Sequence, residues 1–335
     1  MDILRLGPNR PAHFYRGGPW IASFRGLDDP VDTRPEDWIA SVTTRAGDDS
    51  VGLTVLPDRR LLRDAVRADP EAYLGPDHVA AFGIDPALLV KLLNPAQRLP
   101  VHAHPDASFA THHLGCVHGK TEAWLVLEAE PDAAVYLGLR DSVPDDVLRA
   151  WVAEQRVGSL LESLNRLPAR RGDAFLVPAG VPHAIGNGVL LVELQEPTDF
   201  SIFLEWDGFQ LDPSAGHLGL GFDLALQAVD RSARDVSALM SAESADAPRV
   251  RRPFPDAADQ FFRADVLRPG TDEILLAPAW TVLIVTDGDG RLDAQVQSEE
   301  LHRGDVLLVP WGVGPARLVG DVTVIRCRPP EPTAR

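Results

Sequence analysis

The sequence predicts a mainly β protein built from two copies of a β sandwich or barrel, with helices inserted between strands. Short apolar stretches separated by Gly, Pro and Asp turns fill residues 99–206 and the last part of the chain, a pattern typical of such folds. The phrase GDAFLVPAG at 172–180 returns as GDVLLVPWG at 304–312, which indicates two copies of one β unit. Apolar residues recur at helical spacing in only a few stretches, which lie between the predicted strands.

Residues 1 to about 90 predict an irregular lead-in of mixed α and β character. Short apolar runs alternate there with a helical pattern at 59–74, which Pro70 interrupts. The apolar run PALLVKLLN follows at 86–94, with Lys91 as the one charge inside it. A charge in such a run needs a partner or a cavity to face. The alternative is a lysine that reaches solvent from a strand edge.

From 99 to 206 we expect a series of short strands, interrupted at 143–171 by two inserted helices. Asp145 and Asp146 begin that insert and Pro168 ends it, as helix start and stop signals do. A helix-rich connection and a polar, Pro-bounded linker precede the final strands. The expected units are therefore an N-terminal segment with the first β unit at 1–215, a helical connection and linker at 216–256, and the second β unit at 257–335.

Composition and charge exclude several classes of protein. The chain has 335 residues, is 45% hydrophobic and carries a formal net charge of −17, so it lacks the clustered cations that nucleic acid binding requires. No apolar run approaches the ~18 residues of a membrane helix. The N-terminus has no signal for secretion. Cys116 and Cys327 lie far apart, which suits free thiols in a reducing cytoplasm.

A candidate metal site is distributed over three segments. His102 and His104 alternate in LPVHAHP, so both point to one face if that stretch is extended. Glu122 begins a strongly apolar strand, where a lone carboxylate is costly unless it is paired or ligating. His183 follows the turn of GDAFLVPAGVPHAIGN. Three imidazoles and one carboxylate without a thiolate suit Zn²⁺, Mn²⁺, Fe²⁺ or Ni²⁺.

Each of these signals is weak alone, because an isolated H-x-H is more often a pair of hydrogen-bonded core histidines and a strand glutamate usually faces solvent. Their combination with the spaced Gly, Pro, His and Asn of 172–187 favours a metal site. In the second copy of the repeat, Pro315 stands where the histidine would fall. One copy can therefore hold a metal ion and the other cannot.

Lysine is nearly absent from the chain. Of its 32 basic residues only Lys91 and Lys120 are lysines, and the rest are arginines. An ammonium can shift its pKa and act as a compact point charge, which a guanidinium cannot do. Two functional lysines are one interpretation, and two ordinary surface lysines are the other.

The stretches LLVKLLNPAQRLPVHAHPD, GKTEAWLVLEAEPDAAVYLG and RRGDAFLVPAGVPHAIGNGVLLVELQEPTD resemble the two motifs of the cupin superfamily. Together with GDVLLVPWG and the early FYRGGPWIASF and PEDWIAS, they resemble type I phosphomannose isomerases over nearly the whole chain. The resemblance implies two cupin jelly-roll barrels, the second degenerate and without metal ligands. It also implies a zinc isomerase that interconverts an aldose and a ketose, such as mannose 6-phosphate and fructose 6-phosphate, through an enediol.

Carried over residue by residue, the resemblance places metal ligands at four positions and active-site groups at three. The ligands are His102, His104, Glu122 and His183, and the active-site groups are Lys120, Glu193 and Lys91. Glu193 is our candidate general base, since aldose–ketose exchange requires a base next to the carbonyl.

This chain departs from the family pattern at three positions. His102 replaces a ligand that is usually Gln, Pro100 replaces a serine that helps to hold phosphate, and Phe203 replaces an arginine proposed to act in catalysis or on phosphate. The last two changes replace a hydroxyl and a guanidinium, both of which could bind a phosphate dianion, with apolar side chains. The substrate is therefore expected to be a small sugar or sugar phosphate that need not be phosphorylated.

Two other functions stay open at this point. Three histidines and a glutamate also bind Fe²⁺ in cupin dioxygenases, although the two lysines and the inserted helices argue against that function. A non-catalytic, sugar-binding or regulatory cupin would keep the metal and lose the chemistry. We expect a cytoplasmic monomer or homodimer that binds neither membrane nor nucleic acid.

Overall fold

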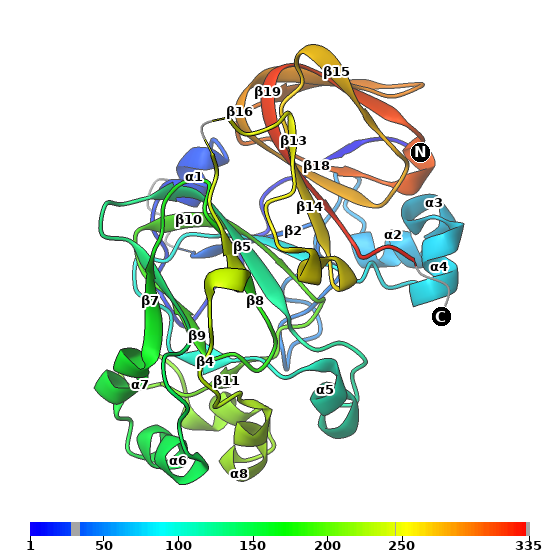
Figure 1. Ribbon diagram of the computed structural model, residues 1–335. Helices are drawn as coiled ribbons and strands as arrows, with labels where there is room; N and C mark the ends of the chain where they lie inside the picture. Colours follow the sequence, from blue (N-terminus) through cyan, green and yellow to red (C-terminus); the bar gives the residue numbers. More distant parts are fainter. Residues whose placement is uncertain (28–33, 245, 333–335) are drawn as a thin grey trace.

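The computed structural model describes residues 1–27, 34–244 and 246–332, and its strands form three antiparallel sheets (Figure 1). The C-terminal sheet lies above the two sheets of the central part of the chain, and the helices α5 to α8 gather at the opposite end of the molecule. The prediction of a mainly β fold with two jelly-roll units and inserted helices is confirmed.

A six-stranded sheet forms one wall of the first unit. Its strands are nearly continuous apolar runs because both faces are covered. All of the residues of β3 and β10 are buried, including the charged side chains Lys91 and Glu193. In order across the sheet, the strands are β12 (Met240–Ser241), β8 (Ala174–Val177), β5 (Glu122–Ala129), β10 (Val189–Gln195), β3 (Leu89–Leu93) and β2 (Glu36–Ile39).

A five-stranded sheet forms the opposite wall. Its strands are short, and the extended stretch that the sequence predicted around His102 is reduced to the two residues of β4. Apolar residues such as Ala103 and Ile202 face a small core beneath the inserted helices. The strands in order are β11 (Ile202–Phe203), β4 (His102–Ala103), β9 (His183–Ile185), β6 (Ala134–Leu139) and β7 (Leu164–Pro168).

An eight-stranded sheet makes up most of the second unit. Alternate residues of its long central strand point to opposite faces, so Val282 and Ile284 join the large core of the first unit while Leu283 and Val285 fill a separate core. The main path is β1 (Leu4–Arg5), β18 (Val306–Val309), β16 (Thr281–Asp293), β19 (Ala316–Arg328), β14 (Arg263–Leu267) and β13 (Val250–Arg251), with β15 (Gly270–Leu276) paired to β19 and β17 (Ser298–His302) paired to β16.

The sequence repeat is also a structural repeat. The phrases at 172–180 and 304–312 form β8 and β18, each second in the order of its sheet. In both copies the glycine N–H donates to a valine carbonyl of the next strand at 2.9 Å, and that valine N–H donates back at 2.9 Å to the aspartate carbonyl after the glycine. Gly172 and Gly304 have φ of 87° and 91°, which a β-carbon disfavours. The idea of two copies of one β unit is therefore supported by hydrogen bonds as well as sequence.

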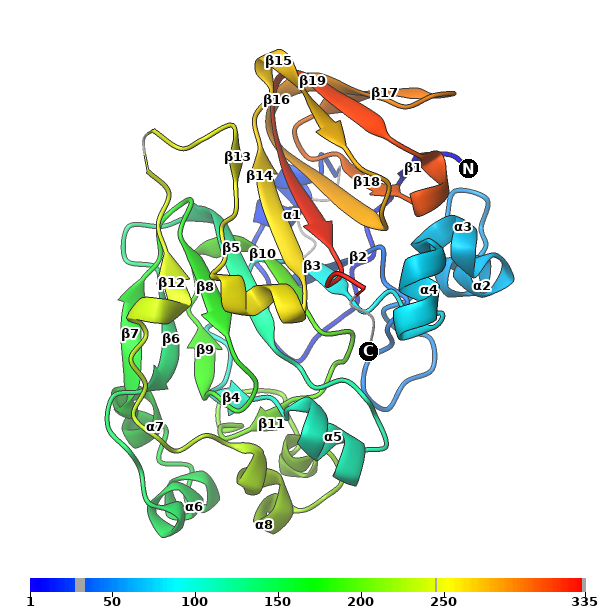
Figure 2. The ribbon, with the colours of Figure 1, turned by 45° about the vertical axis from the view of Figure 1, so that its right-hand side comes forward.

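Helices connect the strands and cover the open end of the first unit (Figures 1 and 2). Pro70 begins α3 instead of simply ending the helix before it, and Asp69 caps α3 by accepting from Ala72 N–H. The α helices are α1 (Trp20–Phe24), α2 (Leu62–Ala68), α3 (Pro70–Leu74), α4 (Pro76–Phe82), α5 (Ala107–His113), α6 (Asp145–Ala153), α7 (Val157–Ser163) and α8 (Phe222–Ala225). The 3-10 helices are η1 (Pro213–His217), η2 (Leu226–Ala228), η3 (Ser237–Leu239), η4 (Asp256–Gln260) and η5 (Trp311–Val313).

The connections between the units contain more strand than the sequence indicated. The insert at 143–171 holds α6 and α7, as expected, and also β7. The connection at 216–256 holds α8, short 3-10 helices and two edge strands, β12 in the six-stranded sheet and β13 in the eight-stranded sheet. Residues 28–33, 245 and 333–335 of the three expected units lie outside the described residues. The unit boundaries stay a prediction.

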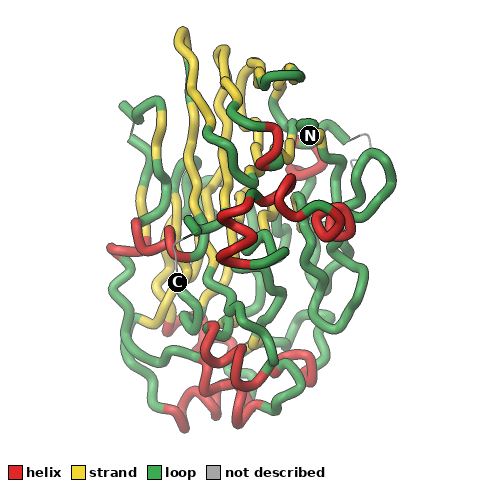
Figure 3. Tube along the Cα trace, turned by 90° about the vertical axis from the view of Figure 1, so that its right-hand side faces the viewer, coloured by secondary structure: helices red, strands yellow, loops and turns green. Residues whose placement is uncertain are grey.

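The strands lie roughly along one axis of the molecule, and helices cross that axis at one end and at mid-height (Figure 3). Within the described ranges, no helix has both the length and the apolar character needed to cross a bilayer.

The pairing of β1 with β18 predicts that the first residues stabilise the second unit. Ile3 is 4% exposed in the core of that unit, and replacement with Ala should lower the free energy of unfolding by ~2–4 kcal/mol because a cavity remains. Leu275→Ala is a matched control in the same sheet, since Leu275 is 68% exposed and its loss should cost under ~0.5 kcal/mol. Urea unfolding of both variants measures the difference, and equal midpoints would contradict the role of β1.

Candidate metal centre and substrate cavity

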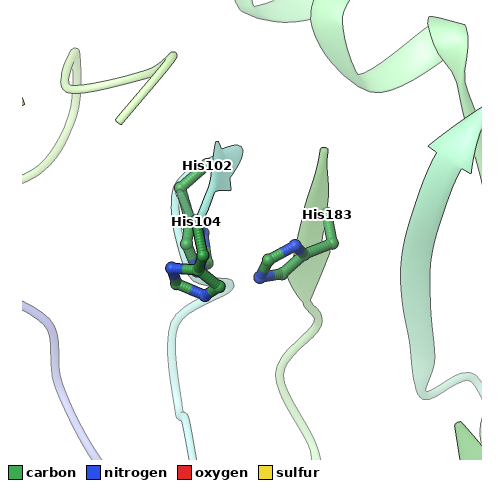
Figure 4. A group of neighbouring side chains, drawn as sticks. All are labelled: His102, His104 and His183. Carbon is green, nitrogen blue, oxygen red and sulfur yellow. The ribbon is translucent and has the colours of Figure 1, made fainter. Parts of the chain in front are cut away.

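Three histidines converge between the two walls of the first unit (Figure 4). His102 lies on β4 directly opposite His183 on β9, and His104 follows β4 by one residue. The ring centroids of His102 and His183 are 4.2 Å apart, and one nitrogen from each of the three rings lies within 4.8 Å of the other two. Across the described part of the chain this is the only such group of three or more His, Cys, Asp or Glu side chains.

Backbone carbonyls fix the orientation of all three rings. A carbonyl can only accept, so the ring nitrogen that it contacts must carry the proton, and the other nitrogen presents its lone pair. In each ring the contact is made by Nδ1, at 2.7–2.8 Å, to the carbonyl oxygens of Pro100, Phe200 and Val181 for His102, His104 and His183 respectively. The three Nε2 atoms are thus left as acceptors, which is the arrangement that metal-ligating histidines adopt.

Glu122 brings a carboxylate to the same point from the six-stranded sheet. Its Oε2 is 3.1 Å from His104 Nε2 and its Oε1 is 3.3 Å from His183 Nε2. Among the described residues, neither Glu122 Oε2 nor His183 Nε2 has a partner with hydrogen-bond geometry. Buried acceptors that face one another without a proton between them are costly, and a cation removes that cost. The four side chains therefore fit a divalent metal ion with N and O ligands.

Burial keeps the imidazoles of His102 and His104 neutral. Desolvation, assisted by the nearby Lys120 ammonium, lowers the pKa of His104 to about 3, and desolvation with the neighbouring imidazoles lowers the pKa of His102 well below its usual value. Burial would raise the pKa of Glu122, but Lys120 and His104 outweigh it and lower that pKa. At neutral pH the site thus offers unprotonated nitrogens and an ionised carboxylate, the forms that bind metals.

Lys120 lies beside this group. It precedes β5 by two residues, and its ammonium is 3.2 Å from both Glu122 Oε2 and His104 Nε2. The side chain is almost fully buried. The structure therefore brings Lys120 together with two of the four sequence-predicted ligands.

A second charged cluster surrounds Lys91. The Lys91 ammonium lies 3.3 Å from Glu36, 3.8 Å from Glu193 and 3.8 Å from Asp199, and 4.3 Å from the centroid of the Trp38 ring. Burial alone would lower the pKa of Lys91, but the three carboxylates outweigh it and raise that pKa. Lys91 is thus a buried, paired cation instead of a lysine that extends from a strand edge.

Glu193 is the acid of this cluster whose pKa is raised. It pairs with Lys91 on β3 and with Trp124 on β5, and it accepts a 3.1 Å hydrogen bond from Trp124 Nε1. Burial, followed by the negative charge of Glu122, raises the pKa of Glu193 from 4.5 to about 8. A carboxyl with a pKa in this range can both release and take up a proton near neutral pH.

Several residues of this cluster were missed by the sequence reasoning. Glu36 accepts hydrogen bonds from Tyr15 Oη at 2.5 Å and Trp38 Nε1 at 2.7 Å, and His13 Nε2 is 3.3 Å away. Asp199 is the other omission. The only signal for them was the segment PEDWIAS and the end of the third family-like stretch, because nothing local in residues 13–15 indicates contact with Lys91.

One cavity connects both clusters. It encloses about 1040 Å³ of empty space, partly open to solvent, and both lysines, Glu193, Glu122 and His102 contribute to its lining. Phe203, on β11 beside His102, lies with its ring centroid 5.8 Å from that imidazole and 5.3 Å from the edge-on ring of Phe14. One wall of the cavity is thus charged and the other aromatic. All seven sequence-predicted site residues lie in or next to it.

Comparisons with known proteins agree with this architecture. No family model matches the chain. It is 26% identical over 315 residues to the mannose-6-phosphate isomerase of Streptococcus mutans, a match that covers 92% of this chain and 93% of that protein. It is 24% identical over 249 residues to a Bacillus subtilis mannose-6-phosphate isomerase, which covers 70% and 72% of the two chains.

Solved structures give the same result for the fold. The mannose 6-phosphate isomerase of Bacillus subtilis superposes with a TM-score of 0.76 at 21% identity, over 98% of this chain and all of that one. A mannose 6-phosphate isomerase bound with zinc and yttrium superposes with a TM-score of 0.74 at 15% identity, over 99% and 100% of the two chains. The resemblance seen in the motifs is confirmed: over nearly its whole length this chain is similar to the mannose-6-phosphate isomerases.

Proposed function

We propose that the protein is a zinc-dependent aldose–ketose isomerase, acting on mannose 6-phosphate and fructose 6-phosphate or on a related sugar. The single observation that carries the proposal is that Glu193, with a pKa near neutrality, lines the same cavity as the buried histidine and glutamate group. Relatives named mannose-6-phosphate isomerase support the reaction class. The names of these relatives, and not the cavity itself, suggest phosphate.

His102, His104, His183 and Glu122 would hold the metal ion. When bound, a divalent cation supplies Lewis-acid polarisation of the carbonyl and hydroxyl oxygens of the open-chain sugar. Zn²⁺ fits four ligands of mixed N and O type, and a neighbour bound with zinc supports that choice, while Mn²⁺, Fe²⁺ and Ni²⁺ share the ligand preference.

Glu193 would move the proton that defines the reaction. In its ionised form the carboxylate takes the proton from C2 of the aldose, and in its neutral form it returns that proton to C1, which gives the ketose through an enediol. The Trp124 indole N–H holds Oε1 of this carboxylate in place, leaving Oε2 on the side of Lys91. Burial of the carboxyl, which raises its pKa, makes it a stronger base than an exposed glutamate.

The two lysines would act on the oxygens of the sugar. Lys120, next to Glu122 and His104, is placed to move the hydroxyl proton between O1 and O2 and to stabilise negative charge there. Lys91 is held by three carboxylates and stays charged, so its role is to orient the substrate and the Glu193 carboxylate.

We infer a cytoplasmic monomer or homodimer with the metal site in a unit spanning 1–215, a connection at 216–256 and a second unit at 257–335 without a metal site. The experiment that tests the function is NMR detection of proton exchange at C2 of candidate aldoses by the zinc-loaded protein. Absence of exchange with every sugar would favour a non-catalytic binding protein.

Replacement of His104 with Ala should remove both metal and turnover. The variant loses one ligand and the neighbour of Lys120, so bound zinc should fall and turnover should drop roughly 100-fold or more. His112→Ala is the control, because His112 is exposed and bonded to Ser108 within its own helix. Elemental analysis and NMR turnover assays read both effects, and full zinc content in His104→Ala would remove that residue from the ligand set.

Replacement of Lys120 with Ala should separate chemistry from metal binding. Zinc should stay bound because the ligands remain, whereas turnover should fall by about 10²–10⁴, the contribution of one acid–base group. Lys120→Arg keeps a positive charge beside Glu122 but cannot release a proton, so it should be nearly as inactive. Wild-type turnover in Lys120→Arg would show that only the charge matters.

Replacement of Glu193 with Gln should change the pH dependence of stability as well as activity. Between pH 4.5 and 8 the folded carboxyl keeps a proton that the unfolded one has lost, so the metal-free protein should lose stability as pH rises through this window. Glu193→Gln removes that loss and should also lower turnover by about 10²–10⁴. Thermal unfolding at pH 5 and pH 8 compares the two proteins, and an identical decrease in both would contradict the raised pKa.

A further inference from the structure

The cavity beside His102 has an apolar wall. Phe203 and Phe14 meet edge to face with ring centroids 5.3 Å apart, and Phe14 also contacts Phe209 at 6.4 Å. The wall continues without a charged group among Leu99, Pro100, Ile185, Leu211, Ala215 and Leu218. Such a wall suits the C–H face of a sugar ring and provides no hydrogen-bond donor for an anion.

The two lysines that line the cavity are already paired with carboxylates. Lys91 has three of them within 3.8 Å, and Lys120 has Glu122 at 3.2 Å. Over the described residues the lining contains the carboxylates Glu36, Glu122, Glu193 and Asp199 against the cations Arg45, Lys91 and Lys120. The divalent metal ion that we propose would add two positive charges, and Glu122 offsets part of them.

Two arginines near the cavity are also engaged. The Arg45 guanidinium donates to the carbonyl of Ala12, and Asp199 accepts from the N–H of the neighbouring Ala46 at 3.3 Å. Arg98 forms a bidentate pair with Glu205 at 2.6 and 2.8 Å and does not line the cavity. Glu205 is 1% exposed and also accepts from Val101 N–H at 2.8 Å, so this pair is part of the structure.

A phosphate dianion needs the opposite surroundings. Proteins bind phosphate with Arg forks, lysines or clustered backbone N–H groups that have no other partner, because a buried and unpaired dianion is very costly. The aromatic wall would leave the phosphate oxygens unpaired, and in the charged wall both lysines already have carboxylate partners.

We propose that this site selects an unphosphorylated hexose, aldose or ketose, with Phe203 as the specificity-determining residue. The inference rests on the proposed isomerase function. The open-chain sugar would present its reacting C1–C2 end to the charged wall and its uncharged C6 hydroxyl end to the aromatic wall.

The first test compares paired substrates. The zinc-loaded protein is assayed with mannose and with mannose 6-phosphate by NMR at equal concentrations. We expect kcat/KM for the free sugar to exceed that for the phosphate by about tenfold or more. A preference of about tenfold or more for the phosphate, or equal values, would overturn the inference.

A charge placed in the wall should weaken the preference for the free sugar. Phe203→Arg adds an unpaired guanidinium beside the C6 end, so the ratio of kcat/KM for phosphorylated to free sugar should rise by roughly tenfold or more. Phe203→Leu is the matched control, because it keeps the wall apolar and should keep the preference for the free sugar. Circular dichroism and zinc content verify that both variants fold. An unchanged ratio in Phe203→Arg would remove Phe203 from substrate selection.

A binding measurement separates this inference from the isomerase proposal. Calorimetric titration of the zinc-loaded protein with fructose and with fructose 6-phosphate needs no turnover. Tighter binding of the free sugar supports the inference even if neither sugar is isomerised, in which case only the isomerase function fails. Tighter binding of the phosphate contradicts the inference and leaves the isomerase function intact.

Discussion

The contact of the buried Glu122 carboxylate with the imidazoles of His104 and His183 is the constraint on which the rest of the structure depends. Glu122 comes from one sheet and the histidines from the other, so the two walls must approach closely at this point. Acceptors that oppose one another in a dry interior are costly, and a fold that places them there needs a compensating cation. The covering helices and the apolar core beneath them hold the five-stranded wall in position.

The charged cluster around Lys91 also exists because a buried charge needs partners of opposite charge. Lys91 occupies a fully buried strand, and the nearby carboxylates and the Trp38 ring supply the partners that its charge requires. Those partners place Glu193 between a cation on one side and the indole N–H of Trp124 on the other. Glu193 is therefore held in an environment where a small change in surrounding charge alters its protonation.

The fold, the metal group and both lysines could be predicted from the sequence. The partners of Lys91 could not, because they come together only in the tertiary structure. The histidine spacing, the glutamate at the start of an apolar strand and the repeated phrase are local signals, and they indicated the fold, both lysines and the metal group. Glu36, His13 and Tyr15 reach Lys91 only through tertiary contacts of a segment with weak periodicity. The strand predicted around His102 was too long, since β4 contains only His102 and Ala103.

The pairing of β1 with β18 has a consequence for synthesis on the ribosome. Leu4 lies opposite Leu308, so about 300 residues of chain separate the two strands that pair at this edge. At about 5–20 residues per second, β1 is synthesised on the order of 15 to 60 s before β18. This edge of the second unit can therefore pair only after the long intervening chain has been made.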